Sequence, residues 1–319
     1  MKQTSVMVYG AGAIGIAIGA SLYSEGLKVS FFAREATAKA INEGGVLRKG
    51  LFGEKKAPAG EVKAYSDLAE VPEGSFDFIL VSTKTTANRD AAKNLYEHRN
   101  ILKENGRIVI LQNGWGNDEP FLEYFDKDTI FQARVITGFT REERNVSRIT
   151  VHTAPILFGS LYGRDTAPLK VIADAINASG IESAVTDTLS EALWAKMLYN
   201  TTLNPLGAIL NVPYGKLADS EGSRAIMNRL IDETYKVMEA YGYKSFSATA
   251  EDYKKIFYDK LIPDTREHRS STLQDIERKI HTEIDTLNGC IVRMAEKKGF
   301  DAPTHRMICE LIHAIEDNF

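Results

Sequence analysis

Short hydrophobic runs in the first part of the chain alternate with a helical pattern. Runs of apolar and β-branched residues bounded by glycine, asparagine or charged residues are typical of buried strands. They are SVMVYG (5–10), KVSFFAR (28–34), FDFILVSTK (76–84), RIVILQNG (107–114) and TIFQARVITGF (129–139). Between the first two, AIGIAIGASLYSEG predicts a helix that ends at Gly26, where a C-terminal cap is expected. A strand, a helix and a second strand form the βαβ unit of a parallel sheet.

The pattern changes near Thr188. Before it, RNVSRITVHTAPILFGSLYG (144–163) predicts additional antiparallel strands. After it, nearly every segment has helical period, as in SRAIMNRLIDETYKVMEAYG (223–242) and TEIDTLNGCIVRMAEKKG (282–299), each closed by a glycine. We therefore predict an α/β domain over 1–188 and an all-helical domain over 189–319, with a tight junction that can form a cleft because no long linker separates them.

Composition narrows the class of protein. The 319 residues suffice for two domains that each bury a core, and 44% hydrophobic and 26% charged residues are ordinary for a globular protein. A net charge of -4 argues against a nucleic-acid partner, because nucleic-acid binders normally carry a basic excess or a basic stripe. No window approaches 18 apolar residues and the N-terminus lacks a cleavage-type signal, so we expect no membrane association and a cytoplasmic location. Cys290 and Cys309 are expected to be buried free thiols.

A glycine fingerprint follows the first predicted strand and opens the first predicted helix. Its residues are Gly10, Ala11, Gly12, Ala13, Ile14 and Gly15, which fit G-x-G-x-x-G. Gly10 would allow a tight turn, Gly12 would let the backbone approach a pyrophosphate, and Gly15 would let helix and sheet pack closely. The phosphates would lie at the helix N-terminus, where unpaired N–H groups favour anions. This context predicts a Rossmann-type dinucleotide-binding domain; the alternative is a purely structural glycine cluster.

Arg34 stands at the end of the second predicted strand, where NAD-preferring proteins usually carry an acidic residue. An arginine there suits the 2'-phosphate of NADP, and a charge-assisted hydrogen bond would contribute roughly 1.5–3 kcal/mol. Glu35 is adjacent and complicates the preference, and the alternative is that Arg34 is a solvated surface charge.

Two more polar residues follow predicted strands, where open α/β sheets bind ligands. Lys84 follows FILVST and Asn113 follows IVILQ. Both are candidates for contact with the nicotinamide ribose and the reacting region. The alternative is that Asn113-Gly114 is a plain turn and Lys84 a helix-entry residue.

Three polar residues share one face of an otherwise apolar helix predicted in ALWAKMLYNTTLNPLGAI. Lys196, Asn200 and Asn204 are four residues apart, so their side chains stack on one side of the helix. One ammonium and two amides in an apolar wall indicate a buried polar site. The alternative is a snorkelling lysine with two solvent-facing asparagines.

The C-terminal part contains Ser270-Ser271-Thr272-Leu273-Gln274-Asp275, then Thr282-Glu283-Ile284-Asp285 and Asn288-Gly289. Together with GAGAIG, LQNG and the KxxxNxxxNP stripe, this order resembles the ketopantoate reductase (2-dehydropantoate 2-reductase) family over nearly the whole chain. The resemblance implies an NADPH-binding Rossmann domain, a helical domain, and reduction of the 2-keto group of a small 2-keto acid, ketopantoate, to D-pantoate in pantothenate biosynthesis.

The same resemblance implies roles for individual residues. Lys196 would be the acid that protonates the nascent alkoxide, and Glu283 would help to place the lysine and the substrate. Asn200 and Asn204 would lie near the substrate hydroxyls, and Ser271 would bind the substrate carboxylate. Lys84 and Asn113 would be cofactor-side residues, and Arg34 would read the 2'-phosphate.

Physical chemistry agrees with these roles. Reduction of a carbonyl leaves negative charge on oxygen, which a nearby cation stabilises and protonates. A lysine with its ordinary pKa of about 10.4 carries that proton at neutral pH; burial would lower the pKa and Glu283 would raise it. No metal is required, and the six histidines show no HxxxH or HExxH spacing.

Two departures from the family bear on the substrate. Tyr214 stands where many members carry a further asparagine, and Ile280 stands where a basic residue is common. Both would make the pocket more apolar or differently shaped, which shifts selectivity by about 1–3 kcal/mol. A D-2-hydroxyacid dehydrogenase acting on branched or aromatic 2-keto acids is therefore the nearest alternative. A non-catalytic NADP-sensing protein is a third, and the helices of the second domain could pair two subunits or form a monomer's core.

Overall fold

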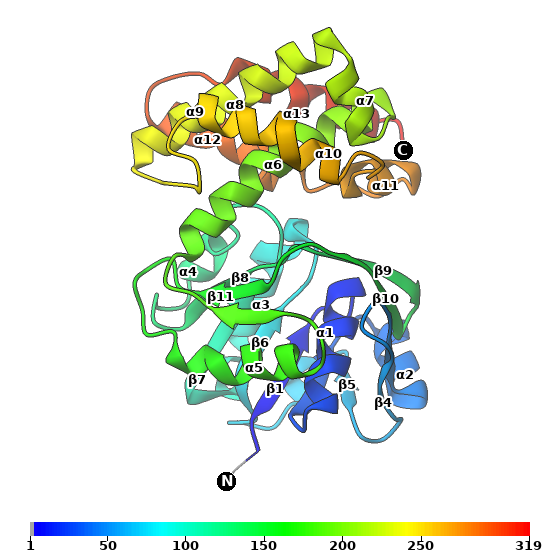
Figure 1. Ribbon diagram of the computed structural model, residues 1–319. Helices are drawn as coiled ribbons and strands as arrows, with labels where there is room; N and C mark the ends of the chain where they lie inside the picture. The colour runs from blue at the N-terminus through cyan, green and yellow to red at the C-terminus, as the bar shows by residue number, and fades with distance from the viewer. Residues whose placement is uncertain (1–2) are drawn as a thin grey trace. The chain divides into compact units, whose positions relative to one another are not determined.

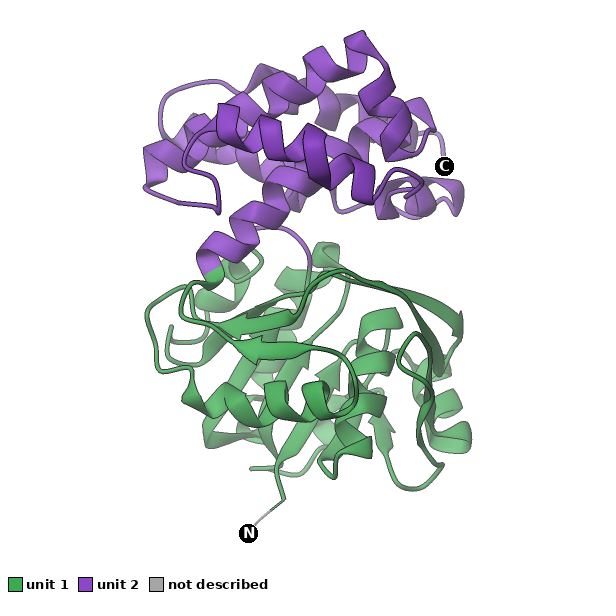
Figure 2. Cartoon of the chain, viewed as in Figure 1, with its two compact units in different colours: residues 1–112, 117–189 green, residues 113–116, 190–319 purple. Residues whose placement is uncertain are grey.

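The computed structural model describes residues 3–319, which form two compact units (Figure 2). Unit 1 comprises residues 1–112 and 117–189, and unit 2 comprises residues 113–116 and 190–319. The short loop 113–116 therefore belongs with the helical unit although it begins only three residues after a strand of the α/β unit ends. The periodicity of the sequence does not indicate this exchange.

Unit 1 is built on an eight-stranded sheet (Figure 1). In spatial order its strands are β12 (Ser183–Val185), β11 (Ile156–Gly159), β8 (Ile130–Arg134), β7 (Leu102–Ile110), β6 (Phe76–Val81), β1 (Ser5–Tyr9), β2 (Lys28–Phe32) and β5 (Lys63–Tyr65). The strands from β8 to β5 are parallel, and β11 pairs with β8 in the antiparallel sense. The predicted α/β class is confirmed.

Alternation along β1 explains how both faces of this sheet are buried. Val6 and Val8 belong to one core cluster, and Met7 and Tyr9 belong to another on the opposite face. The helices of unit 1 are α1 (Ala13–Ser24), α2 (Glu35–Gly44), α3 (Asn88–Glu97), α4 (Glu119–Leu122) and α5 (Lys170–Ala178), with short 3-10 turns at Leu68–Glu70, Thr85–Ala87, Arg99–Ile101 and Ala167–Leu169.

A second, four-stranded sheet covers α1 on the side away from its own βαβ unit. Its order is β4 (Lys55–Ala57), β3 (Val46–Gly50), β10 (Val146–His152) and β9 (Thr137–Glu143). Because α1 contacts both sheets, every residue from 15 to 22 is buried, which explains its apolar sequence on all sides. The run 129–139 was predicted as one strand; it divides into β8 and β9, which belong to different sheets.

Unit 2 is all-helical, as predicted. Its helices are α6 (Leu189–Leu210), α7 (Tyr214–Asp219), α8 (Glu221–Tyr241), α9 (Ala250–Ile256), α10 (Ile262–Asp264), α11 (Ser271–Glu277), α12 (Asn288–Lys297) and α13 (Pro303–Glu316), with a π-turn at Phe257–Leu261 and a 3-10 turn at Ile284–Thr286. The segment 282–299 is not one helix, because TEID forms the 3-10 turn and α12 begins only at Asn288. No helix within residues 3–319 combines the length and apolar composition needed to cross a membrane.

Candidate active site

The three glycines after β1 differ in what an added Cβ would meet. Gly10 has φ +105°, and a Cβ there would lie 2.7 Å from the backbone nitrogen of Thr83. A Cβ on Gly15 would collide with the carbonyl oxygen of Gly10 and lie 2.6 Å from Ser82 Oγ. At Gly12, by contrast, the nearest atom to an added Cβ is Ser82 O at 3.9 Å. The tertiary structure therefore demands glycine at 10 and 15, and it leaves open space beside Gly12.

The start of α1 is suited to an anion. Gly12 caps the helix without a side-chain hydrogen bond, and the first intrahelical bond runs from the Ile16 N–H to the Gly12 carbonyl. The N–H groups of Ala13, Ile14 and Gly15 thus precede the first helical hydrogen bond, at the positive end of the helix dipole. Ala11 is buried in the sheet core. These features fit the pyrophosphate of a dinucleotide.

Arg34 caps α2, and its carbonyl accepts from the N–H groups of Thr37 and Ala38 at 2.8 and 3.0 Å. Its side chain is exposed and has no ion pair within residues 3–319. A second guanidinium reaches the same helix end, because Arg141 of β9 donates from Nη2 to Thr37 Oγ1 at 3.0 Å. Burial, followed by the positive charges of Arg144 and Arg34, lowers the pKa of Arg141.

Sequence reasoning missed Arg141 and Arg144. Arg141 is held by the carbonyls of Glu143 at 3.3 Å and Arg144 at 2.7 Å rather than by a carboxylate. The positive charges of Arg34 and Arg144 thus act on Arg141 near the start of α2. The signal in the sequence is Arg141-Glu-Glu-Arg144 between two predicted strands, but only the pairing of β9 with β10 brings it to α2.

Lys84 lies three residues beyond the end of β6, exposed at the start of a 3-10 turn. Its neighbourhood is fixed by Gln112, which ends the unit 1 segment before Asn113. Gln112 Nε2 donates to Thr83 O at 2.8 Å and to Asn88 Oδ1 at 2.6 Å. These two hydrogen bonds join the segments that follow β6 and β7.

The loop 113–116 is anchored in unit 2. The Trp115 ring lies 4.8 Å from that of Trp194 and 4.9 Å from that of Tyr243, measured between centroids. The Trp115 N–H donates to Thr286 O at 3.1 Å, and a Cβ on Gly114 would lie 2.5 Å from the same oxygen. The aromatic packing fixes Asn113, at the start of this loop, against the helical unit.

Lys196 Nζ donates to Asn113 Oδ1. The lysine is on α6, 83 positions away along the chain, and it is half-buried. A second tie holds this region together, because the Trp115 bond to Thr286 joins the same loop to the turn that Glu283 begins. The structure thus brings Lys196 and Asn113 into contact and places Glu283 in the turn on which the loop packs.

The asparagines of the stripe differ in burial. Asn200 is half-buried, and no hydrogen bond occupies its side chain within residues 3–319. Asn204 is only 5% exposed, so the alternative of solvent-facing asparagines is wrong for this residue. Its Oδ1 accepts from the Tyr214 hydroxyl at 2.6 Å, and its backbone carbonyl accepts from Ser270 Oγ at 2.9 Å.

Ser270 and Ser271 are adjacent but have different environments. Ser270 is buried, and its hydroxyl caps α11 by accepting from the Leu273 N–H at 3.0 Å. Ser271 is exposed at the first position of α11. Ile280 is 42% exposed and does not form part of a buried wall, contrary to the expectation that it shapes a pocket.

A proline within α6 is compensated by a buried network. Pro205 has no N–H to donate to the Thr201 carbonyl one turn earlier, and Asn288 Nδ2 donates to that carbonyl instead at 2.9 Å. The same Nδ2 donates to His305 Nδ1 at 3.0 Å, while His305 Nε2 lies 3.0 Å from the Leu230 carbonyl. Burial lowers the pKa of His305 to about 4, so the ring is neutral and structural.

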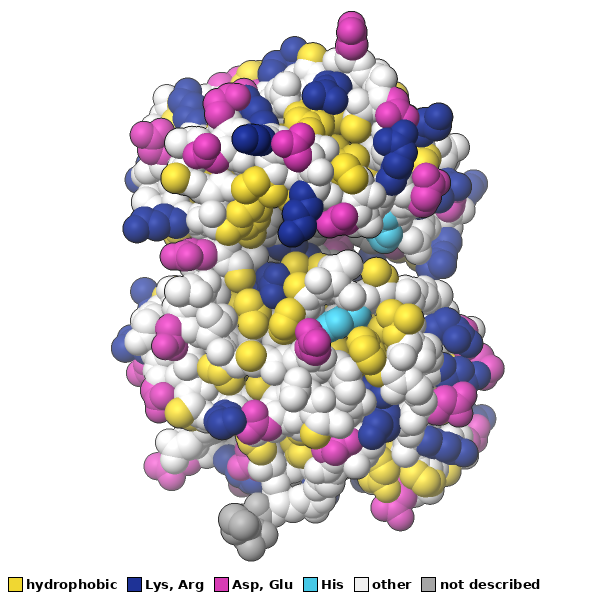
Figure 3. All heavy atoms as spheres, in the orientation of Figure 1, with side chains coloured by type: hydrophobic (Ala, Val, Ile, Leu, Met, Phe, Trp, Pro, Cys, Tyr) yellow, Lys and Arg dark blue, Asp and Glu magenta, His cyan; other side chains and the backbone are white. Residues whose placement is uncertain are grey.

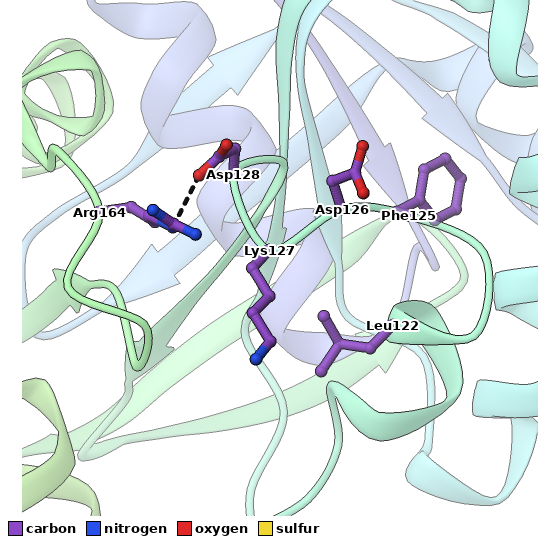
Figure 4. A pocket seen from close by; sticks show the side chains of 6 residues that line it. All are labelled: Leu122, Phe125, Asp126, Lys127, Asp128 and Arg164. Carbon is purple, nitrogen blue, oxygen red and sulfur yellow. Dashed lines mark ion pairs between the residues drawn. The ribbon is translucent and has the colours of Figure 1, made fainter.

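A surface pocket of unit 1 lies apart from these residues. It is lined by Leu122, Phe125, Asp126, Lys127, Asp128 and Arg164. Figure 4 shows Arg164 and Asp128 pointing toward one another, with an ion pair of 2.6 Å. None of the predicted site residues lines it.

On the face in Figure 3 acidic and basic side chains are interspersed. Within residues 3–319 no three His, Cys, Asp or Glu side chains are grouped to hold a metal, and both cysteines are buried free thiols.

A phosphate-binding glycine loop on a parallel sheet, with a lysine and amides on a separate helical unit, defines the class as nicotinamide-dependent oxidoreductases. Two family models match the chain: "Ketopantoate reductase PanE/ApbA" over residues 6–163 and "Ketopantoate reductase PanE/ApbA C terminal" over residues 188–316. The chain belongs to the PanE/ApbA ketopantoate reductase family, and it is a 2-keto acid reductase of that family.

Known relatives agree. The chain is 34% identical to 2-dehydropantoate 2-reductase of Aquifex aeolicus (strain VF5), over 97% of this chain and 96% of the relative. It is similar to the crystal structure of a PanE/ApbA family ketopantoate reductase from Ralstonia eutropha JMP134, with 28% identity, TM-score 0.85 and 99% of each chain covered. A D-mandelate dehydrogenase solved with NADH and anilino(oxo)acetate shares the fold, with 23% identity, TM-score 0.86 and 99% of each chain covered.

Proposed function

We propose that this protein uses NADPH to reduce 2-dehydropantoate (ketopantoate) to D-pantoate, the reductive step of pantothenate biosynthesis. The observation that carries the proposal is the hydrogen bond from Lys196 to Asn113. It joins an ammonium on the polar stripe of α6 to an amide in the loop 113–116, which begins three residues after β7 ends.

Each residue has a defined task in this reaction. The nicotinamide, when bound, supplies the hydride. Lys196 stabilises the negative charge that develops on the substrate oxygen and donates the proton to it, with Asn113 fixing the direction of the ammonium. Glu283 helps to place the lysine and the substrate. Asn200 and Asn204 bind substrate oxygens and Ser271 binds the carboxylate.

NADPH rather than NADH is supported by the arginines at the start of α2. Among the described residues Arg34 has no ion-pair partner, and Arg141 adds a second guanidinium at the first turn of the helix. A 2'-phosphate offers the dianion that this charge would bind, whereas the uncharged 2'-hydroxyl of NADH does not. The open space beside Gly12 supports the pyrophosphate, and Lys84 would contact the nicotinamide ribose.

The second candidate is a D-2-hydroxyacid dehydrogenase acting on branched or aromatic 2-keto acids. The likeness to a D-mandelate dehydrogenase and the buried Tyr214 favour it. Steady-state NADPH oxidation with ketopantoate, 2-ketoisocaproate and phenylglyoxylate separates the two. We expect the highest kcat/KM with ketopantoate; a far lower value than for either other acid would reassign the substrate. Replacing NADPH with NADH in the same assay tests the cofactor.

A homodimer through unit 2 is supported by exposed apolar residues on α13. Met307 and Leu311 are one helical turn apart and both are exposed. Light scattering coupled to gel filtration tests this, and a monomeric mass at micromolar concentration would contradict it.

A further inference from the structure

Tyr214 is a buried residue that hydrogen-bonds to one atom of the stripe, Asn204 Oδ1. Its side chain is 2% exposed, and its hydroxyl donates to Asn204 Oδ1 at 2.6 Å. The ring is packed edge-on against Tyr199, with centroids 5.8 Å apart and planes at 80°. The Tyr214 N–H also donates to His268 O at 3.1 Å. Ring and backbone are thus fixed independently of the hydroxyl.

The Tyr214 hydroxyl determines which end of the Asn204 amide is used in the hydrogen bond between the two residues, and that end is the oxygen. Within residues 3–319 the Tyr214 oxygen has no partner other than Asn204. If the amide were reversed, the buried O–H would face an NH2 group and lose its acceptor, which costs about 1–3 kcal/mol. Burial also raises the pKa of Tyr214 well above its ordinary value, so the hydroxyl stays protonated and remains a donor.

The backbone of Asn204 is fixed as well. Ser270 Oγ donates to its carbonyl at 2.9 Å and in turn caps α11, whose first residue is Ser271. Three elements therefore meet at Asn204: α6, α7 through Tyr214, and α11 through Ser270. Within residues 3–319 the Nδ2 group of Asn204 has no hydrogen-bond partner, so this is the end of the amide that remains for a ligand.

We propose that Tyr214 is a positioning residue that locks Asn204 as a hydrogen-bond donor toward the substrate. The inference rests on the proposed function and deepens it, because it states which substrate groups the stripe would bind. Lys196 and Asn204 both present N–H groups, so the site recognises acceptor oxygens of the 2-keto acid, its carboxylate, keto or hydroxyl oxygen, and it does not require a substrate O–H donor at Asn204.

The first test is Tyr214→Phe, which removes only the hydroxyl. We expect KM for the 2-keto acid to rise about tenfold, with kcat changed less than about threefold and KM for NADPH unchanged. The dissociation constant of the keto acid from the enzyme–NADP+ complex, which cannot react, should rise equally in calorimetry. Tyr235→Phe is the matched control, because within residues 3–319 the Tyr235 hydroxyl also donates to a carbonyl of unit 2, that of Ser247 at 3.2 Å, and lies 3.2 Å from Ser245 Oγ rather than bonding to the stripe.

The second test compares Asn204→Asp with Asn204→Ala. Aspartate can still accept from Tyr214 but cannot donate, and it sets a negative charge against an anionic substrate. We expect its KM to rise on the order of a hundredfold and above that of the alanine variant. In the Asn204→Ala background, Tyr214→Phe should change KM by less than about twofold, because the coupling is lost.

The outcomes are distinguishable. The positioning role would be overturned, with the reductase intact, if Tyr214→Phe left KM unchanged in an enzyme that turns over the 2-keto acid. It would also be overturned if Asn204→Asp bound the keto acid more tightly than Asn204→Ala, or if Tyr214→Phe had its full effect on KM in the Asn204→Ala background. Wild-type protein that neither reduces a 2-keto acid nor binds one with NADP+ would overturn the proposed function, and this inference with it.

Discussion

The glycine loop of unit 1 and the polar stripe of unit 2 are built by different means. The glycine loop uses backbone N–H groups and empty space within six consecutive residues, Gly10 to Gly15. The stripe uses side chains, and it is completed by Asn113, Tyr214 and Ser270, which lie outside α6. A site made of backbone tolerates few residues at each position, whereas a site made of side chains depends on what neighbouring elements present to it.

The largest expected effect is on the side-chain site. Lys196→Ala should lower kcat on the order of a hundredfold or more, because the variant lacks the ammonium that would protonate the substrate oxygen. NADPH binding, followed by fluorescence, should persist. Lys216→Ala, an exposed lysine on α7, is the control. Unchanged turnover in the Lys196 variant would exclude this lysine as the acid, and a parallel loss of NADPH binding would indicate a structural role.

In the backbone site, substitutions of Gly12 and Gly15 should have different effects on cofactor binding and on thermal stability. Gly12→Ala places a methyl group in open space, so we expect roughly a tenfold to hundredfold rise in KM for NADPH with an unchanged Tm. Gly15→Ala collides with Gly10 O and should lower Tm as well. Thermal unfolding and steady-state kinetics of both variants measure this, and equal behaviour of the two would contradict the distinction.

The arginine cluster tests whether side chains add selectivity to the backbone site. Arg34→Ala should raise KM for NADPH roughly tenfold to hundredfold and leave KM for NADH unchanged. Arg141→Ala should give a smaller rise, about threefold to tenfold, because this guanidinium is also tied to Thr37. Arg148→Ala is the matched control, since Arg148 is on β10 and pairs with Glu142. Equal losses with NADH would show that the arginines do not read the 2'-phosphate.

The smallest effect on activity is expected from His305, which supports α6 at a distance from the reacting atoms. Its pKa of about 4 lies below the ordinary 6.5, so the unfolded chain takes up the proton first as the pH falls. The stability is fully present above pH 6.5 and should decline by about 3 kcal/mol toward pH 4. Urea unfolding across this range measures it, and a His305→Gln variant with the same pH slope would contradict the assignment.

Much of the fold was predictable because its signals are local. The apolar runs at 5–10, 28–34 and 76–84 form parallel strands of a sheet that is buried on both faces. Gly242 ends α8 in the left-handed conformation. The segment 129–139 was not, because its apolar pattern is the same whether one strand continues or two strands join different sheets. TEID likewise has helical spacing, but its chain turns before α12.

The candidate site divides in the same way. Periodicity placed Lys196, Asn200 and Asn204 on one face, and the glycine spacing indicated the nucleotide loop. No local pattern relates Asn113 to unit 2, because its position there depends on Trp115 packing against Trp194 and Tyr243. Arg141 was missed for the same reason, since only strand pairing brings β9 to α2.

The sequence alone determined the α/β and helical units, the dinucleotide loop, the stripe and the family resemblance, because each depends on residues close together or in a recognisable order. The tertiary structure decided that Asn204 is buried, that Tyr214 holds its amide, that Lys196 meets Asn113 and that Ile280 is exposed. Hydrogen bonds and burial depend on side chains from elements far apart in the chain, and their positions are set only when those elements pack.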